Sequence, residues 1–127
     1  MTVTDTHLEE VAKAVNQESA IFPNYQARGT TDIDSVNNDD TTISGEIGTR
    51  QPLTGVRTSN EIEWTAIFSG ANVQDTINGD AYGSVGVFNT DTQSTSDTLQ
   101  IGVAVNGVLQ TTNFDIEVIT NIRYSRN

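Results

Sequence analysis

The sequence has no cysteine and, among its 127 residues, only one histidine and one lysine. Without cysteine the chain forms no disulfide and offers no thiolate, which excludes thiol catalysis and cysteine-ligated zinc. With His7 as the one imidazole, a zinc site would need carboxylates at every other position, which is uncommon. We therefore expect no catalytic residue and no cofactor, and we interpret His7 as an exposed residue in the first turn of a helix.

Basic residues are scarce as well: six Lys and Arg stand against seventeen Asp and Glu, a formal net charge of −11. Binding to nucleic acid or to an anionic membrane surface depends on the opposite sign, so neither is an expected partner. Repulsion among the excess acidic groups is weakened in molar salt, where the Debye length falls to about 3 Å. Two interpretations stay open, a protein from a high-salt organism and an ordinary protein with an acidic surface.

Long apolar runs are missing too, and none approaches the roughly 20 residues of a membrane span. The N-terminus lacks the basic and then apolar pattern of a signal peptide. We expect a soluble chain without a signal peptide. Its length and its mass of 13.7 kDa fit a single domain over residues 1–127.

One helix is expected near the N-terminus, over about residues 6–18. Thr6 and Glu9 have the spacing of a capping box, in which the two side chains satisfy free backbone N–H groups. A narrow apolar stripe follows at helical spacing and consists of Ala12 and three larger residues, Leu8, Val11 and Val15. Such a stripe must contact another surface, so its three larger residues are our candidates for packing or for an interface.

From residue 24 onward the periodicity is that of β-strands. We expect strands at 24–28, 41–57 (bent or broken), 61–69, 82–88 and 99–105, a return strand from Val108, and a long final strand ending at Tyr124. Asn106-Gly107 is the residue pair favoured by a type I′ hairpin turn. These patterns predict a mainly β fold, a β-sandwich or a barrel, of which we choose a single antiparallel β-sandwich with one short N-terminal amphipathic helix.

An acidic loop over residues 32–40 is the one candidate for a metal site. Calcium prefers clustered carboxylate oxygens, which this loop would supply from Asp32, Asp34, Asp39 and Asp40. However, Val36 occupies the next ligand position, and the Gly and the closing Glu of an EF-hand loop do not follow. We therefore expect a solvated loop and no bound metal.

Four phrases of the sequence resemble, in order, those of one protein family. They are residues 26–32 (QARGTTD beside A-x-G-T-G-T-T), 43–50 (ISGEIGTR beside L-x-x-E-V-x-R, with one extra residue), 65–69 (TAIFS beside A-x-F-S) and 84–88 (SVGVF beside E-V-G-L-F, with Ser84 in place of Glu). The family comprises small structural proteins of tailed bacteriophages and archaeal tailed viruses, related to the N-terminal part of phage tail-collar fibre proteins.

The resemblance implies a virion structural protein of a tailed virus and not an enzyme, with a haloarchaeal host as a candidate. A tail-tip, baseplate or fibre-attachment component is expected, with a capsid-surface decoration or turret protein as the alternative. Its partners would be other virion proteins and symmetric copies of itself, in a homo-oligomer within the particle that is assembled in the host cytoplasm. A cellular carbohydrate- or protein-binding β-sandwich module is the alternative of another class.

Unfolding at low and at multimolar KCl separates the two interpretations of the acidic charge. If the protein is adapted to high salt, screening of its −11 charge raises the free energy of unfolding as KCl is added. Urea denaturation followed by circular dichroism measures that free energy. Equal stability in both solutions would remove the halophilic interpretation.

Overall fold

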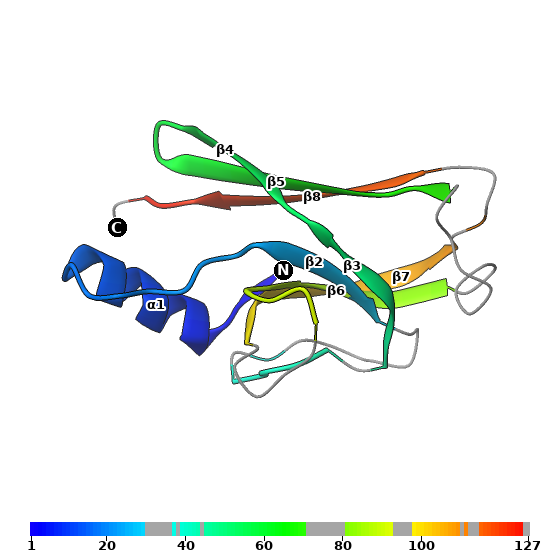
Figure 1. Cartoon of the computed structure of the whole chain (residues 1–127), viewed down its shortest axis with the longest axis horizontal. Helices are drawn as coiled ribbons and strands as arrows, with labels where there is room; N and C mark the ends of the chain where they lie inside the picture. Colours follow the sequence, from blue (N-terminus) through cyan, green and yellow to red (C-terminus); the bar gives the residue numbers. More distant parts are fainter. Residues whose placement is uncertain are drawn as a thin grey trace.

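The structure, a computed structural model, describes residues 1–29, 37, 39–43, 45–70, 81–92, 98–109, 111 and 115–125. Two antiparallel sheets face one another, and a single helix lies at one end of them (Figure 1). The elements are β1 (Thr2–Val3), α1 (Asp5–Val15), β2 (Tyr25–Gly29), β3 (Glu46–Pro52), β4 (Thr54–Thr58), β5 (Glu61–Phe68), β6 (Ala81–Phe88), β7 (Leu99–Leu109) and β8 (Ile116–Arg123). This arrangement confirms the predicted mainly β sandwich with one short N-terminal helix.

The two sheets have five and three strands. The five-stranded sheet has the order β1-β7-β6-β2-β3, and the three-stranded sheet has the order β4-β5-β8. The chain passes from one sheet to the other at Leu53, between β3 and β4. Pro52 has no N–H to give to a strand ladder, and the Leu53 N–H donates instead to the Asn24 carbonyl at 2.8 Å. The expected bent or broken strand over 41–57 is therefore two strands in two sheets.

The core lies between the sheets and follows the predicted alternation. On β5, Trp64, Ala66 and Phe68 are buried, whereas Ile67 faces outward. One buried cluster joins both sheets and consists of Trp64, Val87, Ile101 and Ile122. A second cluster consists of Ala27, Ile43, Phe88 and Leu99.

Gly86 allows the close approach that the second cluster requires. A Cβ atom at this position would lie 2.8 Å from Cδ1 of Leu99 and 2.9 Å from Cγ2 of Ile43. Side chains cannot occupy such distances without moving their neighbours, so any residue larger than glycine would push the cluster apart.

The predicted hairpin turn at Asn106-Gly107 is wrong, because β7 runs through both residues. Its partner β6 continues alongside, with Tyr82 opposite Val108 and Ala81 opposite Leu109. The register shifts between Tyr82 and Ser84, so the extra residues of β7 are absorbed as a bulge. Continued pairing with β6 overrides the local turn preference.

The helix begins and ends earlier than the expected 6–18. Its N-cap is Thr4, whose side chain accepts from the His7 N–H, so the Thr6–Glu9 capping box does not form. At the other end Glu18 N–H donates to Lys13 C=O at 2.9 Å and Gln17 N–H to Ala14 C=O at 3.1 Å. These two bonds make a Schellman motif, with Gln17 in the left-handed conformation at φ 61°.

Replacing Gln17 with glycine should stabilise the fold by about 0.5–1 kcal/mol, because glycine adopts a positive φ without the Cβ clash of other residues. Urea denaturation measures the change in the free energy of unfolding. Asn16→Gly is the matched control, since Asn16 has φ −83° and gains nothing from glycine. A loss of stability in Gln17→Gly, equal to that in Asn16→Gly, would contradict the assignment.

Candidate interaction surface at the helix end

Helix α1 buries polar side chains and exposes apolar ones. His7 is 2% exposed and Glu10 is 6% exposed, whereas Leu8 is 57% exposed and Val15 is 80% exposed. An amphipathic helix on a folded domain normally shows the opposite orientation. The prediction of an exposed His7 is therefore wrong, and the reason lies in the partners that its ring finds.

Both ring nitrogens of His7 are hydrogen-bonded between the two sheets. Nδ1 lies 2.9 Å from Oε1 of Gln100, and Nε2 lies 3.0 Å from the hydroxyl of Tyr124. Because the Gln100 oxygen accepts only, Nδ1 carries the proton of the neutral ring and Nε2 accepts from Tyr124. The edge of the ring meets Trp64, with centroids 6.5 Å apart and planes at 89°. Partial burial raises the pKa of Tyr124, which keeps its hydroxyl a donor.

Thr4 fixes the start of the helix to β7. Its hydroxyl lies 2.7 Å from the carbonyl oxygen of Leu99 and 3.0 Å from that of Gln100, and its own N–H donates to the Gln100 carbonyl at 3.0 Å. Strand β1 precedes Thr4 and pairs with Ile101 and Gly102 of β7. Backbone pairing and side-chain bonds together set the rotation of α1, which turns His7 and Glu10 inward.

Glu10 ties the helix to the segment that follows it. Its carboxylate accepts from Nζ of Lys13 at 2.8 Å and from the N–H of Ile21 at 2.7 Å. These bonds, Lys13 first, lower the pKa of Glu10 against the opposing effect of burial. The charged carboxylate therefore stabilises the fold above the usual titration range of glutamate, and this contribution is lost as the pH falls through the lowered pKa.

The backbone of Ile21 is held from both sides by side chains. Glu10 accepts from its N–H, and Nε2 of the fully buried Gln100 lies 3.4 Å from its carbonyl oxygen, to which it donates. With its backbone groups engaged, this segment keeps the side chains of Ile21 and Phe22 at the surface, where both are exposed. Their exposure thus follows from the hydrogen bonds beneath them.

These contacts leave four apolar side chains of α1 and of the segment after it exposed, and we call this set of residues the helix-end surface. It consists of Leu8, Val15, Ile21 and Phe22. A hollow of about 290 Å³ adjoins it, lined in part by Val11, Phe22, Trp64 and Tyr124. Exposed apolar surface can mark a contact site, and these side chains are our candidates for one.

The stripe of Leu8, Val11 and Val15 does not pack its full length against the domain. Leu8 and Val15 are exposed, and Val11 is half-buried beside the hollow. Packing within the domain therefore accounts for the apolar side chain of Val11 only in part, and it does not account for those of Leu8 and Val15. That the three residues form an interface stays a prediction.

The candidate calcium loop falls only partly within the described residues. Asp32 and Asp34 lie outside them. Asp39 is exposed, and the carboxylate of Asp40 accepts from the N–H of Asn37 at 2.7 Å, which closes a turn. Within the described parts of the chain, no group of three or more His, Asp and Glu side chains is placed to hold a metal ion.

The phrases that carry the family resemblance meet inside the sandwich. The guanidinium of Arg28 stacks on the ring of Phe68 at 4.1 Å, and that of Arg50 stacks on Phe88 at 3.9 Å. Arg50 is also held by both carboxylate oxygens of Glu46, at 2.7 and 2.9 Å. In addition β2 and β6, which carry the first and the last phrase, are neighbours in the five-stranded sheet. The phrases thus specify contacts of the fold.

Comparison with protein-family models gives no match, and comparison with curated proteins gives none either. The resemblance to tailed-virus structural proteins therefore rests on the sequence phrases. Among the described residues, no helix has the length and apolar character needed to cross a membrane.

Replacing His7 with leucine should lower the free energy of unfolding by about 1–3 kcal/mol, because the buried oxygen of Gln100 then lacks its donor. Gln100→Leu should have an effect of similar size. The double variant should lose less than the sum, with a coupling of about 0.5–3 kcal/mol, as expected of residues that share a bond. Urea denaturation of the wild type, the two single variants and the double variant gives the free energies of this double-mutant cycle.

Tyr124→Phe is the control for this cycle. Tyr124 is partly exposed, so water can replace its hydroxyl at Nε2 of His7 and a smaller loss is expected. Strictly additive losses in His7→Leu and Gln100→Leu would show that the two side chains do not stabilise each other.

Proposed function

We propose that this protein is a structural component of a tailed virus, located at the tail tip or at a fibre-attachment site, and that it acts through assembly contacts. The observation that carries the proposal is the helix-end surface, where apolar side chains face solvent while polar ones are buried beneath them. The sequence phrases that resemble tailed-virus structural proteins support the choice of particle.

The helix-end surface has the character of a preformed contact site. The helix beneath it is anchored at Thr4, His7 and Glu10, and the backbone of Ile21 is held by two side chains. A surface fixed in this way loses little conformational entropy when a partner covers it. Rigidity of this kind suits a subunit that takes one position in a particle.

The charge of the protein agrees with this role in strong salt. A net charge of −11 opposes contact between copies at low ionic strength. When salt screens that repulsion, burial of apolar surface can drive association. A high-salt host, such as a haloarchaeon, would supply that condition, and copies related by closed rotational symmetry would bury the same surface in each subunit.

Light scattering in multimolar KCl tests the contact role. We expect the protein to form a defined oligomer, and Leu8→Asp to weaken association by at least about tenfold, since a charge would then be buried in the contact. Ile67→Asp is the matched control, because Ile67 has a similar exposure, 51% against 57% for Leu8, but lies on the outer face of β5. A wild-type protein that stays monomeric at high concentration and high salt would count against self-assembly.

Imaging of virus particles that lack the gene tests the position in the particle. The proposal expects an altered or missing tail tip, or missing fibres. Loss of a feature on the capsid surface would instead favour the decoration or turret role. Particles that are complete in every feature would contradict a structural role in the virion.

A further inference from the structure

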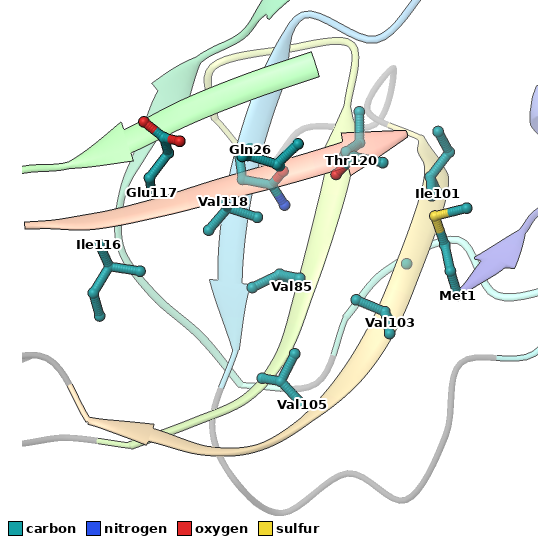
Figure 2. A pocket seen from close by; sticks show the side chains of 13 residues that line it. Met1, Gln26, Val85, Ile101, Val103, Val105, Ile116, Glu117, Val118 and Thr120 are labelled. Atoms are coloured by element: carbon teal, nitrogen blue, oxygen red, sulfur yellow. The ribbon is translucent and has the colours of Figure 1, made fainter. Parts of the chain in front are cut away.

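A groove of about 410 Å³ lies between the sheets, where it is lined by β6 and β7 of one sheet and by β8 of the other (Figure 2). Its walls are mainly aliphatic. Val85, Val103 and Val105 belong to the five-stranded sheet, and Ile116 and Val118 belong to β8. All of these except Val85 are only half-buried, so apolar surface remains open to solvent at this place.

The groove is lined by β8, which is an edge strand of the three-stranded sheet. Residues 116–120 all border it, although neighbouring residues of a strand point to opposite faces. The hollow therefore runs along this segment of β8 and meets its inward side chains as well as atoms of the residues between them. Among the described strands, β8 pairs with β5 alone, and its other edge carries unpaired backbone N–H and C=O groups.

A buried acceptor without a partner also borders the groove. Gln26 is 0% exposed, and its Nε2 donates to the Gly86 carbonyl at 2.9 Å, which fixes the orientation of the amide. Its Oε1 has no hydrogen-bond partner within the part of the chain that the structure describes. Buried polar atoms are normally paired, so a donor is expected to reach this oxygen when the groove is filled.

We propose that this groove is the docking site of an extended segment of another polypeptide, which adds to β8 as a further strand of the three-stranded sheet. The unpaired edge of β8 would bond the backbone of the incoming strand, and the aliphatic walls would receive every second side chain. A hydroxyl on one of those inward side chains would donate to Gln26. A small apolar ligand could fill the groove but would leave the strand edge unpaired.

Charge identifies the outward side chains of this segment. They would lie beside the outward residues of β8, which include the exposed Glu117, on a protein with a net charge of −11. Cross-strand pairs of opposite charge are favourable, so Lys or Arg is expected at the outward positions. The site is distinct from the helix-end surface, and the proposal does not depend on a virion location.

The test uses the full-length protein and the fluorescein-labelled peptide KVKTKVKVK, which places Val and Thr on one face of a strand and Lys on the other. Fluorescence anisotropy should show saturable binding, and hydrogen exchange should slow in residues 116–123. The scrambled peptide KKVVKKTVK has the same composition and charge without the alternation, and it should bind at least about tenfold more weakly. The acidic peptide EVETEVEVE should also bind more weakly at low ionic strength, with the difference shrinking as KCl is added.

Backbone pairing is tested without altering the protein. Methylation of alternate peptide nitrogens along one edge of KVKTKVKVK removes donors and keeps every side chain, and for one of the two possible edges it should abolish binding. Val118→Asp in the groove should weaken binding at least about tenfold, because it buries a charge. Val56→Asp, on the exposed edge strand β4 of the same sheet, is the matched control and should leave binding unchanged.

Three results would overturn the proposal. They are equal affinity for the alternating and scrambled peptides, full binding by both edge-methylated peptides, and saturable binding of 1-decanol in the groove with none of the peptide. The last result would assign the groove to a small amphipathic ligand. None of them bears on oligomer formation through the helix-end surface, so the two proposals fail separately.

Discussion

The hydrogen bonds of the His7 ring with Gln100 and Tyr124 decide which side of helix α1 faces the domain. A buried imidazole with two satisfied nitrogens is stable, whereas turning the helix to bury Leu8 would remove His7 from both of its partners. Gln100 also reaches the backbone of Ile21, so the same bond network positions the segment after the helix. Apolar side chains of the helix are exposed because His7 and Glu10 must face the domain to keep their hydrogen bonds.

A second set of polar side chains lies within the sandwich. The guanidinium groups of Arg28 and Arg50 are buried against phenylalanine rings, and Arg50 is paired with Glu46. Planar guanidinium groups can be buried this way because they stack and bond at once. Two of the six basic residues of the chain are thus used inside the fold. The acidic residues on the surface are left with little compensation, which agrees with the proposed need for salt.

Strand alternation could be read from the sequence because it depends on neighbouring residues. The inward set of β5, from Ile62 to Phe68, and the inward set of β8 follow the predicted pattern. His7 could not be placed in this way, since its partners Gln100 and Tyr124 are 93 and 117 positions away. The turn predicted at Asn106-Gly107 failed for the same reason, because the length of β6 opposite determines where β7 ends. The stripe on α1 predicted a contact for Leu8, Val11 and Val15, but the orientation of the helix could not be predicted, because it depends on the distant partners of His7.

The crossing at Leu53 has a mechanical consequence. One residue joins β3 to β4, so the chain itself holds the two sheets together along that side of the sandwich. On the opposite side, where β7 and β8 border the groove, residues 110–115 also connect one sheet to the other, and His7 bridges them through Gln100 of β7 and Tyr124 after β8. A load that pulls the sheets apart would therefore meet a one-residue tether at Leu53 and a longer, six-residue tether beside the groove, so the two sheets can separate less at Leu53 than at the groove.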